Sequence, residues 1–260
     1  MALVRRPPVV ALLTDFGHRD CYVGVMKGVI LSICPKARLV DLCHEIPPQD
    51  LASASRALIA NARYFPEGTI FAAVVDPGVG TARAAVAARA GGRFYLAPDN
   101  GLLGHLEVDR AVRIENKDLI LQPASRTFHG RDVFAPAAAH LARGVKLDDL
   151  GPRVGKLKTL DLPEPRRTRA GRVGEVVAVD RFGNLITNIP AALAAEGAAV
   201  RLGRRWIGRV VPTYASVKPG AFAALVGSSG VLEIAVRNGD ARSTTGAAVG
   251  APVLVTGEPS

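Results

Sequence analysis

The N-terminal part of the chain alternates short apolar runs, which are typical of buried parallel strands, with longer stretches of helical periodicity. The predicted strands cover residues 9–13, 38–43, 69–75, 84–88, 93–97 and 111–115. The predicted helices cover residues 20–33, 50–64 and 133–143. Strands that alternate with helices favour a mostly parallel sheet with helices on both faces, so we expect an α/β fold of the α/β/α sandwich type.

Two local details follow from the same pattern. The first helix is expected to bury Val25, Val29, Ile30 and Ile33, which share one face at helical spacing. A further short helix is expected after the turn Asp99-Asn100-Gly101.

The C-terminal part of the chain has a different pattern, with short strands, glycine-rich turns and hardly any helical periodicity. The strands predicted there cover residues 173–180, 185–189, 199–202, 206–211, 231–236 and 253–256. This pattern indicates a small β-barrel or sandwich. Because prolines and weak periodicity separate the two patterns, we expect three parts: an α/β/α domain at 1–155, a linker at 156–171 and a β-barrel domain at 172–260.

Composition narrows the functional classes. A chain of 260 residues with 48% hydrophobic and 22% charged residues is typical of a globular protein. The net charge is +10, but the basic excess is spread along the chain and aromatics make up only 5%, so no nucleic-acid partner is expected. Three cysteines without a Cys-x-x-Cys pair suggest neither a disulfide framework nor a zinc site. No apolar run is long enough for a membrane span, and we expect a cytoplasmic protein.

Candidate chemistry begins with the loop from Asp76 to Arg83, which follows the predicted strand 69–75. Asp15 holds the equivalent place after the first strand, and open α/β sheets bind ligands at such carboxyl ends. Pro77 and two glycines leave the loop backbone uncovered between one carboxylate and one guanidinium. From this loop alone, a functional role and a turn-capping Asp76 beside a solvated Arg83 both remain open.

Other polar groups occur at a helix start and at hairpin turns. His129 lies in Phe128-His129-Gly130-Arg131-Asp132 before the Ala-rich helix, where a structural and a catalytic role are both open. Asp180 and Asn184 stand at the tip of the first C-terminal hairpin, where a purely local Asx turn is an alternative to ligand binding. The segment Ser228-Ser229-Gly230 is equally ambiguous.

Four motifs taken together resemble the S-adenosyl-L-methionine (SAM) hydroxide adenosyltransferase family, which is related to the SAM-dependent fluorinase and chlorinase. These motifs are residues 12–17, 76–83, 128–132 and 180–185, and they occur in the family's order over nearly the whole chain. The resemblance implies an α/β/α domain followed by a β-barrel, and a homotrimer with sites at subunit interfaces. It also implies hydrolysis of SAM to adenosine and L-methionine, with SAM as substrate and no cofactor.

The resemblance assigns roles residue by residue. The water-activating group matches Asp76, Arg83 and His129. The substrate-binding positions match Asp15 for the ribose, Asp180 for the methionine amino group, Asn184 for adenine, Ser228 and Ser229 for the methionine carboxylate, and also Phe16 and Phe182.

Three positions separate the water-using from the halide-using members that the chain resembles. The halide-using relatives carry a tyrosine where Asp76 stands and a serine where Gly130 stands. They also carry an arginine in the segment that here reads Ser228-Ser229. By the first two positions this chain resembles the water-using branch, and the third leaves the carboxylate contact as the weakest assignment.

The residue types suit the implied chemistry. Attack on the ribose C5′ of a sulfonium expels a neutral thioether, so neither a general acid nor a metal is demanded. A guanidinium and an imidazole can stabilise a hydroxide-like oxygen while a carboxylate orients the water or accepts its proton. The alternatives are a SAM-dependent halogenase, a non-catalytic adenosine- or SAM-binding protein, and a metal-dependent hydrolase. The last would use Asp15, Asp76, Asp99, His129 and Asp132.

Overall fold

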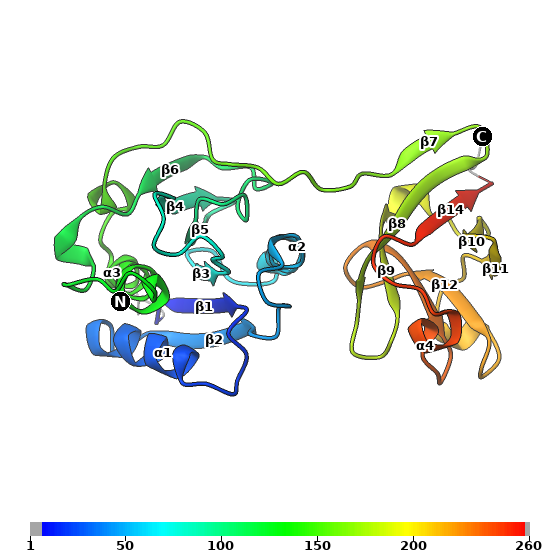
Figure 1. The fold of residues 1–260 in the computed structure, drawn as a ribbon, viewed down its shortest axis with the longest axis horizontal. Helices are drawn as coiled ribbons and strands as arrows, with labels where there is room; N and C mark the ends of the chain where they lie inside the picture. The colour runs from blue at the N-terminus through cyan, green and yellow to red at the C-terminus, as the bar shows by residue number, and fades with distance from the viewer. Residues whose placement is uncertain (1–6, 258–260) are drawn as a thin grey trace, which may run out of the picture. The chain divides into compact units, whose positions relative to one another are not determined.

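The structure is a computed structural model that describes residues 7–257 (Figure 1). The chain divides between Leu160 and Asp161 into two compact units, which are described one at a time.

The first unit is built on a six-stranded sheet. In spatial order its strands are β2 (Arg38–Cys43), β1 (Val9–Thr14), β3 (Ile70–Val74), β5 (Arg93–Pro98), β4 (Ala85–Ala90) and β6 (Arg110–Arg113). Strands β2, β1, β3 and β5 pair in parallel, whereas β4 pairs antiparallel with both β5 and β6. The predicted mostly parallel sheet is therefore confirmed, with β4 as the exception.

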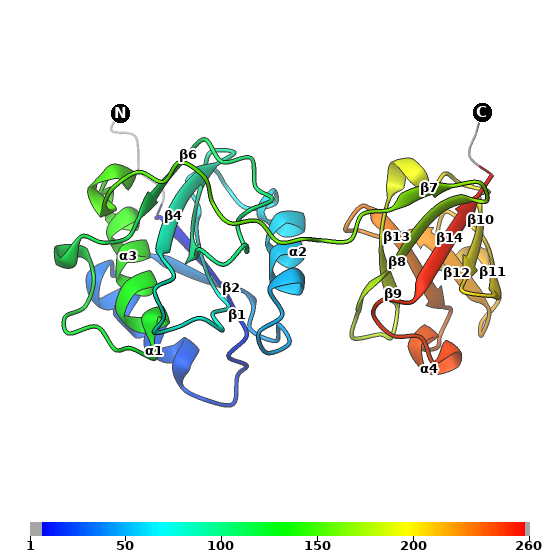
Figure 2. The same ribbon diagram turned by 45° about the horizontal axis from the view of Figure 1, so that its top comes forward.

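Helices cover both faces of this sheet, as the α/β/α prediction requires (Figure 2). Helix α1 (Tyr22–Ile33) and helix α3 (Ala135–Arg143) pack on one face, and helix α2 (Leu51–Ala62) packs on the other. Helix α1 connects β1 to β2, which pairs with one edge of β1. Helix α2 then connects β2 to β3, which pairs with the opposite edge of β1. Strand order therefore reverses at β1 and β3, and such a switch point opens a crevice at the carboxyl ends of the two strands.

Helix α1 begins later than predicted, and its buried face is shifted from the predicted one: Ile30 is buried and Val29 and Ile33 pack against the core, as expected, but Val25 does not. It starts at Tyr22, and its buried residues are Val23, Met26 and Ile30, whereas Val25 is 40% exposed. Positions 23, 26 and 30 follow the three- and four-residue spacing of one helical face. The inclusion of Val25 in the core face was wrong because periodicity alone allowed a neighbouring face.

Two other local predictions differ from the structure. Residues 99–106 form consecutive turns where a short helix was expected. The helix predicted over 133–143 is preceded by a π-helical turn, η2 (Gly130–Phe134), which runs directly into α3. Single π-turns in helices are rare and occur often at functional sites. Short 3₁₀ turns complete the unit, η1 (Lys117–Leu119) and η3 (Leu147–Leu150).

The second unit is an antiparallel, nearly closed barrel. In spatial order its strands are β11 (Arg205–Arg209), β10 (Ala199–Leu202), β14 (Pro252–Thr256), β8 (Gly171–Val179), β9 (Leu185–Pro190), β13 (Val231–Val236) and β12 (Phe222–Val226). The amide of Val211 donates to the carbonyl of Ala224 at 2.8 Å, which brings the segment after β11 against β12. The predicted small β-barrel is confirmed, and β12 is a strand that the hydrophobic pattern missed.

The remaining elements of the second unit are short. They are β7 (Arg166–Thr168), which pairs with β8, the 3₁₀ turns η4 (Ala191–Leu193) and η5 (Tyr214–Ser216), and helix α4 (Ala241–Thr245). The segment 156–171, expected as a linker, thus includes residues that belong to the first unit and a strand that belongs to the second. Within residues 7–257 every helix is too short or too polar to cross a membrane.

Candidate active site

The carboxyl ends of β1 and β3 bring Asp15 and Asp76 to one edge of the sheet. Thr14 and Val74 are register partners at the ends of these parallel strands, so the loops that follow begin side by side. Between the loops lies a cleft of about 320 Å³. Its lining residues are Asp15, Phe16, Tyr22, Gln49, Val74, Asp76, Pro77, Val79, Thr127, Phe128, His129 and Gly130.

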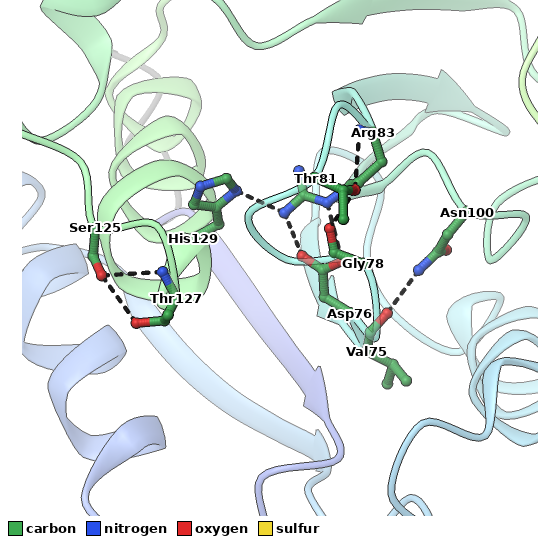
Figure 3. A network of polar contacts seen from close by, with 9 residues as sticks. All are labelled: Val75, Asp76, Gly78, Thr81, Arg83, Asn100, Ser125, Thr127 and His129. Atoms are coloured by element: carbon green, nitrogen blue, oxygen red, sulfur yellow. Dashed lines mark hydrogen bonds and ion pairs between the residues drawn. The ribbon is translucent and has the colours of Figure 1, made fainter.

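Asp76 and Arg83 form a two-point ion pair across their own loop (Figure 3). Nε of Arg83 donates to Oδ1 of Asp76 at 3.0 Å, and Nη2 donates to Oδ2. Both side chains are only 6% exposed, so the pair is shielded from water. Thr81 shapes the loop, because its hydroxyl donates to the carbonyl of Gly78 at 2.7 Å and accepts from the amide of Arg83 at 3.3 Å. A fork-shaped guanidinium suits this two-point contact with a carboxylate.

A second loop brings His129 to the same guanidinium. Nη2 of Arg83 lies 2.6 Å from Nδ1 of His129, and the two side chains face one another in Figure 3. Gly80 makes this approach possible, because a Cβ at that position would lie 2.7 Å from the carbonyl oxygen of Arg126. Gly80 also has a φ of +80°, which glycine adopts without steric cost.

The contact with Arg83 fixes the protonation of His129. Arginine can only donate, so Nδ1 accepts and the neutral ring carries its proton on Nε2. Burial is the largest cause that lowers the pKa of His129 from 6.5, and the charge of Arg83 lowers it further. Asp76 and Asp132 act in the opposite direction and are outweighed. The site therefore holds a neutral imidazole beside an ion pair at neutral pH.

Asp132 anchors the loop that carries His129. Its side chain is 2% exposed, and it accepts from the amide of Ser125 at 2.7 Å and from both Nε and Nη2 of Arg131 at 2.6 and 2.8 Å. Burial would raise the pKa of Asp132, but these hydrogen bonds outweigh it and leave the pKa below its ordinary range. The carboxylate therefore ties η2 to Ser125, at the start of the segment that leads to His129.

At the β1 side of the cleft, Asp15 points a carboxylate oxygen at the next loop. The amide of Gln49 donates to Oδ2 of Asp15 at 2.8 Å. Gln49 has a φ of +66°, an unusual backbone conformation for a residue other than glycine and one that occurs often at binding sites. Next to Asp15, the rings of Phe16, Tyr22 and Phe128 pack with centroids 5.1 to 6.0 Å apart. This side of the cleft offers a hydrogen-bond acceptor beside an aromatic wall.

The predicted substrate-binding residues of the second unit also cluster. Oδ1 of Asp180 accepts from the amides of Phe182 and Asn184 at 2.8 and 2.9 Å, and Oδ2 accepts from Nδ2 of Asn184 at 2.9 Å. The Asx turn that the sequence left open is therefore present. Phe182 stands at the tip of this hairpin with 73% of its surface exposed, as a free aromatic face would.

Ser228 and Ser229 lie in the exposed turn between β12 and β13. Beside this turn, the carboxylate of Glu233 lies so close to Gly227 that a Cβ at that position would clash with Oε2. Glu233 is buried and accepts a hydrogen bond from the hydroxyl of Tyr214. Burial, with the charge of Asp180, raises the pKa of Glu233 although the bond from Tyr214 lowers it. The barrel thus carries a second carboxylate near Asp180, which the sequence motifs did not reveal.

The predicted site residues fall into two groups, one in each unit. Asp15, Phe16, Asp76 and His129 line one cleft, with Arg83 bonded behind them. The residues Asp180, Phe182, Asn184, Ser228 and Ser229 belong to the second unit. Sequence reasoning missed Tyr22, Gln49 and Thr127 in the cleft, since none of them falls in a motif that carries charge.

The carboxylates proposed for the metal-hydrolase alternative have other partners. Oδ1 of Asp99 accepts from the amide of Lys158 at 2.9 Å, Asp132 is bonded to Arg131, and Asp76 to Arg83. Across the part of the chain that the structure describes, no three His, Cys, Asp or Glu residues are arranged as metal ligands. The prediction that no metal takes part stays a prediction.

Each of the two units contains a match to a known protein domain. Residues 10–151 match the SAM hydroxide adenosyltransferase N-terminal domain, and residues 174–254 match the C-terminal domain of the same family.

Among individual proteins, the chain is 46% identical to an (R)-S-adenosyl-L-methionine hydrolase of Thermus thermophilus, over 94% of this chain and 98% of that protein. It is 38% identical to a protein of the same name from Salinispora tropica, over 96% and 98%. It is 32% identical to a fluorinase of Nocardia brasiliensis, over 71% and 72%. A crystal structure of an uncharacterized conserved protein from Thermotoga maritima is 37% identical with a TM-score of 0.90, covering 95% of this chain and all of that one.

The two domain matches together span most of the chain, and the matched N-terminal domain contains the cleft with its Asp76, Arg83 and His129. The chain belongs to the SAM hydroxide adenosyltransferase family.

Proposed function

We propose that this protein hydrolyses S-adenosyl-L-methionine to adenosine and L-methionine, with water as the nucleophile. The observation that carries the proposal is the buried contact of one guanidinium with both a carboxylate and a neutral imidazole at the edge of a cleft. Family membership and the names of relatives that match over nearly the whole chain support the same reaction.

The three side chains divide the work on the water. Each oxygen of Asp76 has a second lone pair, so it can bind Arg83 and still accept a hydrogen bond from water. As the proton leaves the water toward Asp76, the charge of Arg83 and the Nε2 hydrogen of His129 stabilise the developing hydroxide. A bond forms between this oxygen and C5′ while the C5′–sulfur bond breaks. The electron pair stays on sulfur, which leaves as the neutral thioether of methionine, so the departure needs no acid.

Substrate recognition is assigned to the remaining predicted residues. Asp15 accepts from the ribose hydroxyls, and Phe16 supplies part of the wall beside it. From the barrel, Asp180 binds the methionine ammonium and Asn184 the adenine edge, with Phe182 stacking on a ring. Ser228 and Ser229 face the methionine carboxylate.

Assembly and location complete the proposal. We infer that a homotrimer with substrate sites at subunit interfaces is the active form and that it works in the cytoplasm without a cofactor. The division into an N-terminal α/β/α domain and a C-terminal barrel is retained as its domain organisation. Sedimentation of the purified protein tests the trimer, and a fully active monomer would contradict the shared site.

The matching hydrolases are named for the (R) form of SAM. Inverting the configuration at sulfur exchanges the positions of the methyl group and the methionine chain. It leaves C5′ open to the same in-line attack. We propose that the (R) epimer is the preferred substrate. The two purified epimers are incubated together with the protein, and chromatography of the SAM that remains measures this preference.

One incubation separates the proposed reaction from its alternatives. The protein is mixed with SAM in oxygen-18 water, with or without a chelator and with or without excess chloride or fluoride. Labelled adenosine plus methionine, unaffected by chelator and halide, is the expected result. A 5′-halo-5′-deoxyadenosine product would indicate a halogenase, rescue by a divalent ion after chelation would indicate a metal hydrolase, and unchanged SAM would indicate a binding protein.

A further inference from the structure

A buried hydroxyl at the end of β1 lies directly before the cleft. Thr14 is fully buried, and its Oγ1 accepts a hydrogen bond from the amide of Phe16 at 3.2 Å. The same Oγ1 lies 2.8 Å from Nδ1 of His44, whose side chain is also buried. The hydroxyl therefore connects the segment that carries Asp15 and Phe16 to the histidine that directly follows β2.

The partner of His44 sets the direction of this chain of hydrogen bonds. Nε2 of His44 lies 3.0 Å from Oδ1 of Asp41, and Nζ of Lys27 donates to Oδ2 of Asp41 at 2.7 Å. An ionised carboxylate only accepts, so Nε2 carries the proton and Nδ1 accepts from the Thr14 hydroxyl. Each member thus donates to the next, from the amide of Phe16 through Thr14 and His44 to Asp41. Thr14 and His44 are buried and Asp41 is partly exposed, and the hydroxyl and both ring nitrogens have partners, which favours one arrangement of the loop.

The register of β2 is irregular close to the contact between Asp41 and His44. Leu12 pairs with Asp41 and Leu13 pairs with Cys43, so Leu42 is an extra residue in β2. Side chains alternate between the faces of a regular strand, and residues three apart would point in opposite directions. The register shift lies directly before His44, whose side chain contacts that of Asp41.

His44 holds both ends of the short segment between Thr14 and Gly17. Its ring binds the Thr14 hydroxyl, and its carbonyl accepts from the amide of Gly17 at 2.8 Å. Asp15 and Phe16, which line the cleft, lie between these two contacts. Because the ring of His44 is shielded from solvent and does not line the cleft, its influence on a ligand must pass through the loop.

We propose that His44, oriented by Asp41, is a positioning residue that fixes Thr14 and thereby aims Asp15 and Phe16 at the ribose of the substrate. This inference rests on the proposed function for the identity of the ligand, and on geometry alone for the ordering of the loop. Losing the hydroxyl is expected to leave the water-activating group in place and to weaken substrate binding.

The test compares Thr14→Val, which keeps the shape and removes the hydroxyl, with Thr14→Ser, which restores it. Thr14→Val is expected to raise KM for SAM roughly tenfold, about the factor for one lost hydrogen bond, with a much smaller change in kcat. Thr14→Ser should return KM close to that of the unmodified protein. Asp41→Asn, at a partly exposed side chain, should raise KM in the same direction even if Thr14→Val fails to fold.

A second readout does not depend on any substrate. Hydrogen exchange at the Phe16 amide should be about tenfold faster in Thr14→Val and in His44→Asn than in the unmodified protein. The matched control is His140→Asn, a partly buried histidine of α3, which should leave both KM and this exchange rate unchanged.

The outcomes separate the two proposals. If the unmodified protein leaves SAM intact, the proposed function fails, while faster exchange at Phe16 would still support the ordering role of His44. If the unmodified protein hydrolyses SAM and folded Thr14→Val and Asp41→Asn keep its KM, the positioning role is overturned. Exchange at Phe16 that is unchanged in folded Thr14→Val overturns the ordering role as well.

Discussion

Nη2 of Arg83 lies 2.6 Å from Nδ1 of His129 while the same nitrogen also donates to Asp76. One guanidinium therefore joins a loop after a strand to a loop before a helix, and it leaves the imidazole neutral with its proton on Nε2. The chemistry proposed for the protein depends on this shared contact.

The first prediction concerns pH. Burial and then Arg83 lower the pKa of His129 below 6.5, so the ring is neutral at pH 7. Acid places a proton on Nδ1, where it faces the donor of Arg83, and we expect kcat/KM to fall as pH drops through this lowered pKa. Rates measured from about pH 5 to pH 8 should show that limb, centred below the ordinary histidine value.

The same shift predicts the effect of pH on stability. Between the lowered pKa of folded His129 and the ordinary pKa of the unfolded chain, the unfolded state binds more protons. The contribution of this group is thus fully present above the unfolded pKa and is lost as pH falls toward the folded one. Denaturant unfolding of His129→Asn should show a weaker acid dependence than the unmodified protein over this window. An equal dependence in both would contradict the shift.

The second prediction is that Arg83→Lys does not preserve activity. An ammonium cannot hold both oxygens of Asp76 and contact His129 in the same fixed geometry. Turnover should fall by about 10²–10³-fold, within the range of a lost acid–base or oxyanion-stabilising group. Steady-state kinetics measure this, and Arg131→Lys, at a more exposed arginine bonded to Asp132, is the matched control for the chemistry of the change. Comparable kcat in both variants would argue against the shared contact.

The third prediction separates the two aspartates of the cleft. Asp76→Asn keeps the size of the side chain and removes its charge, so kcat should fall by about 10²–10⁴-fold with a smaller effect on binding. Asp15→Ala should do the reverse and mainly raise KM. If Asp76→Asn instead changed KM alone, Asp76 would be a binding residue and the nucleophile assignment would be wrong.

The fourth prediction addresses Gly130, which lies in the cleft beside the aromatic wall. A Cβ at this position would lie 3.1 Å from both Sδ of Met26 and Cε2 of Phe128, and 3.4 Å from Cε2 of Phe16. Gly130→Ala should displace these rings by a few tenths of an ångström and raise KM for SAM. Gly24→Ala is the control for the same substitution at an open position, because an added Cβ there meets nothing within 4 Å, and it should leave KM unchanged. A Gly130→Ala variant with unchanged KM would show that the aromatic wall yields without cost.

Halide is expected to compete poorly in Gly130→Ser as well. The ion pair keeps a carboxylate at position 76, and a second anion beside it would meet like charge. The unmodified protein and Gly130→Ser are each incubated with SAM in excess chloride. Chromatography then measures how much 5′-chloro-5′-deoxyadenosine each one forms. Efficient halide transfer by Gly130→Ser would show that the hydroxyl outweighs the charge of Asp76.

Local patterns predicted much of the fold. Alternation of apolar runs and helical periods is set by which residues avoid water, so the β-α-β-α-β order and the change to short strands were readable before any packing was known. The structure was needed for elements whose identity depends on partners. The antiparallel placement of β4, the strand β12 and the face of α1 around Met26 follow from neighbours that lie far away in the sequence.

For the site, the sequence by itself determined which loops carry chemical groups and, through four ordered motifs, the family to which they belong. Only the tertiary structure decided that Arg83 bonds to both Asp76 and His129, because residues 46 positions apart meet where Gly80 lets two backbones approach. It likewise decided that the ring of His44 lies between Thr14 and Asp41, because parallel pairing brings β1 and β2 side by side. Such contacts arise from strand register and close packing, and neither is recorded in the spacing of residues along one chain.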